Sequence, residues 1–137
     1  MLLRERSHGL LPNRFSDRNS TPEYNTADAT LWLFIATHDY LERTKDMEFL
    51  RDLLYPAALD ILDSHHGRID YDIRVDPADH LLTCGTPHTQ LTWMDAKVGD
   101  LPVTPRNGKP AEIKALWDNG LRITAHWAET LGIDRDR

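Results

Sequence analysis

Apolar side chains recur at three- and four-residue spacings in three stretches of the chain, and this spacing predicts three helices. The first helix is expected to begin at Asn25 or Thr26, either of which could cap it, and to run to about Thr44. Asp28 falls in its first turn, where the helix dipole favours a negative charge. The side chains expected to face the core are Leu31, Phe34, Ile35 and His38, with Trp32 and Leu33 widening the apolar stripe.

The second helix is expected from Asp46 to about His66, because a broad apolar face continues to that point and Gly67 is a normal C-terminal signal. Pro56 lies inside this helix and should kink it or begin a new turn, since proline has no N–H to donate.

The third helix is expected from about Ala111 to Leu131, with Pro110 in its first turn and Gly132 at its end. Its buried face is expected to consist of Ile113, Leu116, Trp117, Leu121, Thr124, Trp127 and Leu131.

One β-hairpin is expected between the second and third helices. Apolar and charged residues alternate over residues 69–76, residues 76–79 form a turn, and residues 81–83 return as the partner strand. The acids of this region suggest calcium, but Arg74 and Val75 stand where a calcium loop needs an oxygen ligand and a glycine. We therefore interpret them as a solvated face. Residues 1–24 are expected to be irregular, with a loop at residues 16–20.

The composition favours a single acidic globular domain. The chain has 137 residues and a net charge of −6, from 22 acidic and 16 basic residues. Acidic chains gain nothing from counterion release at phosphates, so nucleic acid is not expected as a partner, whereas a neutral glucan would suit this charge. The N-terminal sequence lacks the apolar core of a signal peptide, and no run approaches the roughly 20 apolar residues that span a membrane. We expect a cytoplasmic location.

The cysteine and histidine residues suggest neither a disulfide nor a metal site. Cys84 is the only cysteine, and such a residue is most often a small buried one. His65 and His66 are adjacent and so do not share a helix face. No metal or other cofactor is expected.

The densest chemistry lies between Gln90 and Asn119, in a segment that should begin as a loop and finish as a helix. It combines tryptophans, acids, bases and X-Pro turns, and loops of this kind often carry binding or catalytic residues. Trp93 and Met94 could desolvate the carboxyl of Asp95, which is the environment a carboxylic acid needs to hold a proton near neutral pH. The alternative is a surface acid beside a buried tryptophan.

Five blocks of sequence, in the expected order, resemble the C-terminal amylo-α-1,6-glucosidase domain of glycogen debranching enzymes. They are GLLPNRF at 9–15, EYNTADA at 23–29, QLTWMDAKVGD at 90–100, VTPRNGKPAEI at 103–113 and ALWDN at 115–119. The resemblance implies a mainly α fold, a toroid of six helical hairpins that is several hundred residues long. We therefore expect residues 1–137 to be a partial (α/α)6 toroid with one small β-hairpin, and a fragment of such a domain. The loop at Asn13 would lie at the mouth of the sugar pocket.

The resemblance also implies an inverting hydrolysis, which needs two carboxyls roughly 6.5–9.5 Å apart, one acid and one base. Asp95 would be the proton donor, although a close Lys97 would favour its ionised form. The base is implied to be a glutamate beyond residue 137. Glu112 and Glu129 are the glutamates that follow Asp95, but neither lies in a segment resembling the family's base, so the base is assigned to no residue.

Further residues are expected to bind the glucose being cleaved. Asp28 is a candidate for hydrogen bonds to its hydroxyls, with a helix-start acid as the alternative. Trp93 and Trp117 could offer flat faces to pyranose rings, although Trp117 could instead belong to the core. The polar candidates are Lys97, Arg106 and Lys109 as donors, and Glu112 and Asn119 as hydroxyl partners, with a first-turn helix acid as the alternative for Glu112.

The chain departs from the family pattern at several positions. Lys114 replaces Asn and Asp118 replaces Tyr, which changes the charge beside the expected pocket. Gly120 replaces Ala at a cost of about 1 kcal/mol in a helix. Ala111 stands where Val is favoured, and His80 stands where Gly is usual.

Three functional hypotheses follow. The first is a glycoside hydrolase domain that cleaves α-1,6-linked glucose stubs of glycogen or limit dextrin, expected to be incomplete in this chain. The second is a non-catalytic glucan-binding fragment or inactive remnant that binds glycogen or α-glucan oligosaccharides. The third is a helical interaction module, which predicts tolerance of Asp95→Asn. A partial toroid leaves apolar helix faces uncovered, so we also expect self-association.

Overall fold

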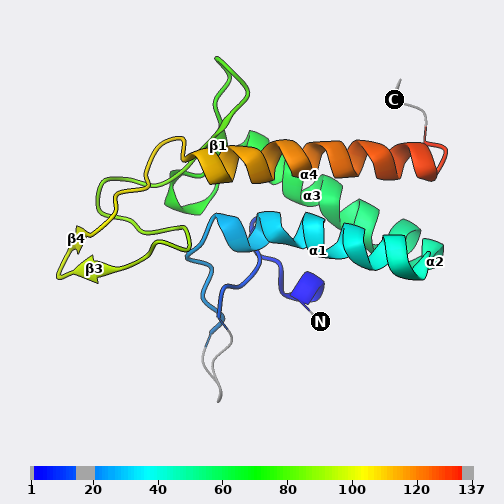
Figure 1. Cartoon of the computed structure of the whole chain (residues 1–137), viewed down its shortest axis with the longest axis horizontal. Coiled ribbons are helices and arrows are strands. Elements are labelled where there is room, and N and C mark those ends of the chain that lie inside the picture. Colours follow the sequence, from blue (N-terminus) through cyan, green and yellow to red (C-terminus); the bar gives the residue numbers. More distant parts are fainter. Residues whose placement is uncertain (1, 15–20, 134–137) are drawn as a thin grey trace.

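The computed structural model describes residues 2–14 and 21–133, and the predicted loop at residues 16–20 lies outside them. Helices α1 (Asp28–Thr44) and α4 (Ala111–Thr130) lie side by side and run in the same direction, and α3 (Tyr55–His66) runs behind them in the opposite direction (Figure 1). The ends of α1 and α4 that begin each helix therefore lie beside the loops that follow α3. The fold is mainly helical, as predicted.

Helix α1 begins later than expected. Its first residue is Asp28 and the preceding residue is Ala27, so the prediction of an Asn25 or Thr26 cap is wrong. The reason is a contact that local sequence does not reveal: the N–H of Ala27 donates to the carbonyl of Leu91 at 2.7 Å. This bond fixes the entry of the chain into the helix.

Two residues expected in the core are exposed. Trp32 on α1 is 54% exposed, because the buried residues Leu31 and Phe34 lie on a narrower stripe than predicted. Leu121 on α4 is also exposed, and its place on the buried face is taken by Gly120 and Ile123. Both corrections leave large apolar side chains on the outside of helices.

The second predicted helix is helical throughout but has three parts. Asp46 caps it, with the Phe49 N–H donating to Oδ1 at 3.0 Å. The parts are α2 (Met47–Phe49), the π-helix η2 (Leu50–Leu54) and α3 (Tyr55–His66). The π-helix ends at Leu54, two residues before Pro56, whose missing N–H cannot continue the α-helical ladder.

The predicted hairpin is present but shorter than its sequence pattern. Strand β1 (Arg74–Val75) pairs antiparallel with β2 (Leu82–Thr83). Residues Asp70–Asp72 form the 3-10 turn η3 instead of a strand, with Tyr71 and Asp72 at φ values of 60° and 57°. His80, at the position where the related pattern has Gly, also has a positive φ of 59°.

A second hairpin was not predicted. Strand β3 (Lys97–Val98) pairs with β4 (Leu101–Pro102) around Gly99 and Asp100, and Gly99 has a φ of 60°. A two-residue loop with glycine at its first position is a hairpin signal, which the short flanking strands concealed. The expectation of one β-hairpin is therefore wrong, because the described residues contain two.

Helix α4 agrees closely with its prediction, beginning after Pro110 and ending before Gly132, which has a φ of 68°. Gly120 has a packing role that the sequence did not show. A Cβ placed there would lie 3.1 Å from Cδ2 of Phe34, so the missing side chain allows α4 to approach α1. Phe34 in turn stacks on Trp127 at 6.5 Å between ring centroids.

The core joins the three long helices to the first hairpin. Its most deeply buried members include Leu31, Ile61, Ile113, Trp117 and Leu82. Among the described residues, none of the helices has both the length and the apolar character that a membrane crossing needs.

Candidate functional site

Most of the sequence-predicted site residues lie at one end of the molecule, where α1 and α4 begin and the loop of residues 85–110 crosses them (Figure 1). This end of the molecule has three features: a buried acid on α1, an ion pair between the loop and α4, and an open polar cavity beside Asp95.

The buried acid is Asp28. Its carboxylate Oδ2 accepts the Trp93 N–H at 2.9 Å, and the residue is 8% exposed. Burial raises the pKa of Asp28, while backbone N–H groups of Trp93, Asp28 and Ala29 act in the opposite direction and the nearby charge of Glu112 raises it further. Asp28 therefore ties the start of the Trp93–Asp95 segment to α1.

The ion pair joins Arg106 to Glu112. Nη1 of Arg106 lies 3.2 Å from Oε2 of Glu112, and Nη2 donates to Sδ of Met94 at 3.2 Å. Nε of Arg106 and Oε1 of Glu112 are buried without hydrogen-bond partners among the described residues. The pair thus supports the segment from the α4 side and leaves one buried donor and one buried acceptor unpaired among the described residues.

Asp95 lines an open cavity of about 240 Å³. The other lining residues are Asn13, Asn25, Thr26, Gln90 and Lys97. Gln90 donates from Nε2 to the carbonyl of Ala96 at 3.1 Å, and Lys97 donates from Nζ to the carbonyl of His88 at 2.6 Å. Amide, hydroxyl, carboxylate and ammonium groups together can exchange hydrogen bonds with several hydroxyls of a sugar.

The apolar surroundings expected for Asp95 are absent from the described structure. Asp95 is exposed and Trp93 is 66% exposed, so the tryptophan does not cover the carboxyl. The carboxyl that burial does affect is Asp28, which the sequence analysis placed in a substrate-binding role.

Other predicted contacts lie away from this cavity. Trp117 is 2% exposed and stacks on His65 at 5.5 Å between ring centroids, so it is a core residue in this structure. Nζ of Lys109 forms ion pairs with Oδ2 of Asp76 at 2.6 Å and with Oδ2 of Asp79 at 2.7 Å. Asn119 is partly exposed, two turns along α4, and does not line the cavity.

Sequence reasoning gave no chemical role to four residues that line the cavity: Asn13, Asn25, Thr26 and Gln90. The signal was available, since all four belong to the sequence blocks that carry the family resemblance. Asn13 lines the cavity beside Asp95, and the assignment of its loop to the mouth of a sugar pocket stays a prediction. Phe15, from the same block, lies outside the described residues.

Cys84 lies beneath the site and is buried, as predicted. Burial raises the pKa of its thiol to about 11, with further contributions from the charges of Glu112 and Asp28. Within residues 2–14 and 21–133, no group of three or more His, Cys, Asp or Glu side chains is arranged to hold a metal ion.

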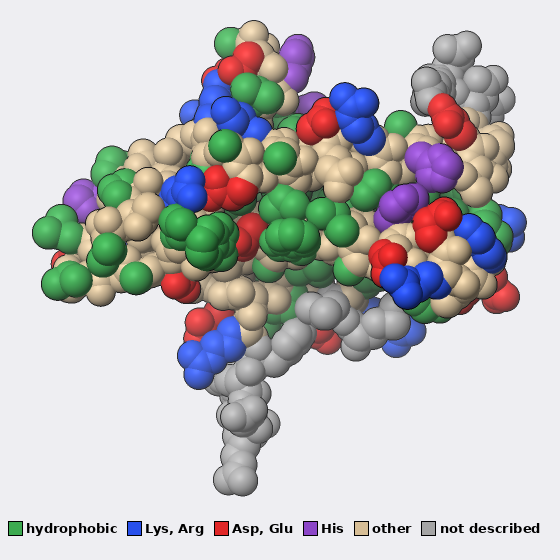
Figure 2. All heavy atoms as spheres, viewed as in Figure 1, with side chains coloured by type: hydrophobic (Ala, Val, Ile, Leu, Met, Phe, Trp, Pro, Cys, Tyr) green, Lys and Arg blue, Asp and Glu red, His purple; other side chains and the backbone are tan. Residues whose placement is uncertain are grey.

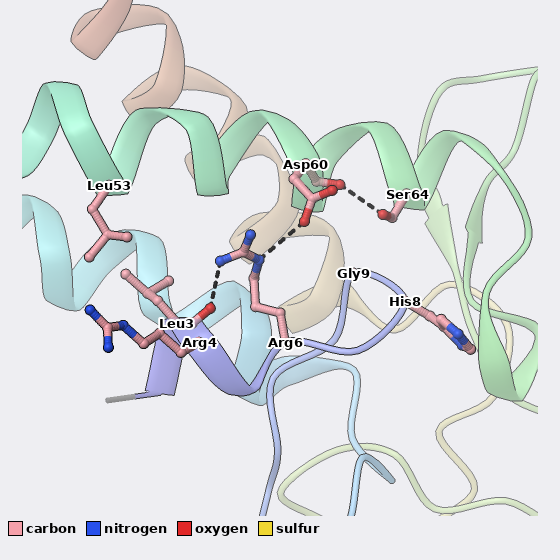
Figure 3. A pocket seen from close by; sticks show the side chains of 8 residues that line it. All are labelled: Leu3, Arg4, Arg6, His8, Gly9, Leu53, Asp60 and Ser64. Carbon is pink, nitrogen blue, oxygen red and sulfur yellow. Dashed lines mark hydrogen bonds and ion pairs between the residues drawn. The ribbon is translucent and has the colours of Figure 1, made fainter.

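A larger cavity, of about 390 Å³, lies between the N-terminal segment and α3 (Figure 3). Arg6 points toward Asp60, with Nε 3.1 Å from Oδ2, whereas Arg4 and His8 point away to either side. Because its central cation is already paired and its other basic groups do not converge, this cavity is a weaker candidate for ligand chemistry. It shares no lining residue with the cavity beside Asp95.

The fold and the site therefore define a mainly helical domain, with a polar cavity at the end where the helices meet the loops. The family model for amylo-alpha-1,6-glucosidase matches residues 1–137, and the chain belongs to this family. No curated protein matches the chain.

Proposed function

We propose that this chain contributes the proton-donor side of a glycoside hydrolase site that removes α-1,6-linked glucose stubs from glycogen or a related α-glucan. The observation that carries this proposal is the polar cavity around Asp95, in a chain whose whole length matches the amylo-alpha-1,6-glucosidase family. The hydrogen-bonding groups that line the cavity are mainly neutral, which suits a polyhydroxylated substrate.

In the proposed reaction, a protonated Asp95 gives its proton to the glycosidic oxygen as the bond to the anomeric carbon breaks. Water, deprotonated by a second carboxylate, attacks that carbon from the opposite face and inverts its configuration. The reaction needs no cofactor. Closure of the cavity by the bound glucan would supply Asp95 with the desolvation that it lacks in the open site.

We propose substrate contacts for the predicted site residues whose side chains are accessible from the cavity or the surface. The ring of Trp93 is available to stack on a pyranose, and Lys97 lies in the cavity beside Asp95. Arg106 and Glu112, whose side chains are partly exposed, would bind hydroxyls with the parts of their guanidinium and carboxylate groups that reach the surface. Asp28, whose Oδ2 is taken by the Trp93 N–H, would act by positioning the Trp93–Asp95 segment.

The base remains unassigned. Among the described residues that line the cavity, Asp95 is the one acid, whereas inversion needs two carboxyls. We propose that the base comes from a part of the protein that does not line this cavity. The same observation favours a second candidate function, a glucan-binding domain without hydrolytic activity.

Glucose release from a glucan that carries single α-1,6-linked glucosyl stubs tests the first proposal. In a protein that contains both this chain and the base, we expect release to fall at least about 100-fold in Asp95→Asn, the size expected for loss of general acid catalysis. Asp100→Asn, which changes an exposed acid in the neighbouring β-turn, is the matched control and should keep the activity.

Equal rates of release with Asp95→Asn and with the native sequence would remove Asp95 from the mechanism. No release by the protein that contains both this chain and the base, together with saturable glucan binding, would instead support the binding function.

A further inference from the structure

The surface where α1 and α4 lie together carries a histidine cluster outside the proposed glycosidase site. His38 on α1 faces His126 on α4, with 5.7 Å between their ring centroids and nearly perpendicular planes. Figure 2 shows histidine side chains gathered on the surface over these two helices, with acidic and basic side chains around them. Both rings line a cavity of about 400 Å³, together with Glu42, Arg122 and Ile123.

We propose that His38 and His126 form a two-imidazole binding site for a divalent transition metal of the zinc, copper and nickel group. Imidazole is a preferred ligand of these ions, whereas magnesium and calcium prefer oxygen. The other coordination positions would be filled by water, because no third His, Cys, Asp or Glu among the described residues is already arranged as a ligand.

The geometry of the two rings supports this site. A zinc ion lies about 2.0–2.1 Å from each ligating nitrogen, so two rings bound at a tetrahedral angle have centroids roughly 5 Å apart. The observed separation of 5.7 Å between the ring centroids is close to this value. Nδ1 of His38 is buried and has no hydrogen-bond partner among the described residues, so the protein offers no bond that a metal would have to replace.

The charges around the cluster are compatible with a cation. Glu42 lies one helical turn beyond His38 on α1, and Arg122 lies one turn before His126 on α4. Arg122 forms an ion pair with Asp118, in which Nε lies 2.8 Å from Oδ2. Lys45 forms an ion pair with Glu42, in which Nζ lies 2.9 Å from Oε2. Glu42 also lines the cavity that holds both rings, so its carboxylate lies close to the proposed site.

A metal held between α1 and α4 would clamp the two helices, since it binds the folded chain and not separated helices. The test is denaturant unfolding of the native chain with ZnCl2 or MgCl2. We expect zinc at about 100 times its dissociation constant to lower the unfolding equilibrium constant about 100-fold, and magnesium to leave it unchanged.

Variants His38→Ala and His126→Ala should each weaken zinc binding about 100-fold, because each loses the advantage of two linked ligands. His88→Ala, which removes an exposed imidazole elsewhere, is the matched control and should keep the effect. Zinc stabilisation that survives in both cluster variants would overturn the proposal.

A second measurement does not depend on the folding of any variant. In a zinc titration of the native chain followed by 15N NMR, the imidazole nitrogens of His38 and His126 should shift together and reach saturation at one zinc per chain. Movement of one imidazole without the other, or of neither, would overturn the two-histidine site.

Discussion

At the scale of single residues, Asp28 shows how one carboxylate can hold a functional loop. Its Oδ2 bonds to the backbone of Trp93, 65 residues further along the chain, and burial raises its pKa. Local sequence correctly placed Asp28 in the first turn of a helix. It could not show this partner, because the contact depends on how the loop folds back over the start of α1.

The raised pKa of Asp28 predicts a specific dependence of stability on pH. The folded state binds the Asp28 proton more tightly than the unfolded state, whose pKa is near 3.8. The stability that Asp28 contributes is therefore fully present below that value and is lost as pH rises through the raised folded pKa. Asp28→Asn keeps an oxygen acceptor for the Trp93 N–H and cannot ionise, so its stability relative to the native chain should increase with pH across this window.

Urea unfolding of both proteins at several pH values between 3 and 7 measures this difference. Asp28→Ala is the companion variant and should lower the free energy of unfolding by about 1–3 kcal/mol, because the Trp93 N–H loses its acceptor. A constant difference between Asp28→Asn and the native chain at every pH would contradict the assigned pKa shift.

At the scale of elements, apolar spacing predicted three helices because each buries one continuous face against the same core. The ends of the second and third helices were also predictable, since Asp46, Gly67 and Gly132 act within their own turns. The start of α1 was not, because it depends on the backbone of Leu91, which is distant in sequence. The residues Asn13, Asn25 and Gln90 lie in the blocks that carry the resemblance, but their meeting in one cavity depends on how distant segments fold together. The second hairpin was missed for a local reason, its two-residue strands.

The contact between α1 and α4 gives a prediction about Gly120. In an exposed helix, Gly→Ala raises stability by about 1 kcal/mol. Here the new Cβ would meet the ring of Phe34 at 3.1 Å, so Gly120→Ala should bring no such gain.

A double-mutant cycle with Phe34→Leu, followed by urea unfolding, separates packing from helix propensity. The smaller side chain should make Gly120→Ala more favourable by at least about 0.5 kcal/mol than it is beside Phe34. Additive effects would show that the close approach of the helices is unimportant for stability.

At the scale of the whole molecule, apolar side chains remain on the outside. Figure 2 shows hydrophobic groups at the end formed by β3 and β4 and again over α1. Val98 and Leu101, on the hairpin, are 73% and 69% exposed. Exposed apolar groups of this size favour contacts with other apolar surfaces.

We therefore predict that the 137-residue chain associates with itself as its concentration rises, because exposed apolar patches favour burial. Sedimentation velocity over a concentration series measures this, and the paired change Val98→Thr and Leu101→Thr should weaken association. Ala115→Ser, at an exposed position of α4, is the control and should not. A single monomeric species at every concentration would contradict this prediction.

The central claim, that the cavity beside Asp95 is the glucan site, is tested most directly by a 1H–15N NMR titration with a maltooligosaccharide that carries one α-1,6-linked glucose. The backbone amides of Asn13, Asn25, Gln90, Asp95 and Lys97 should shift along one saturable curve. Shifts confined to the cavity between the N-terminal segment and α3, or no shifts at high oligosaccharide concentration, would contradict the claim.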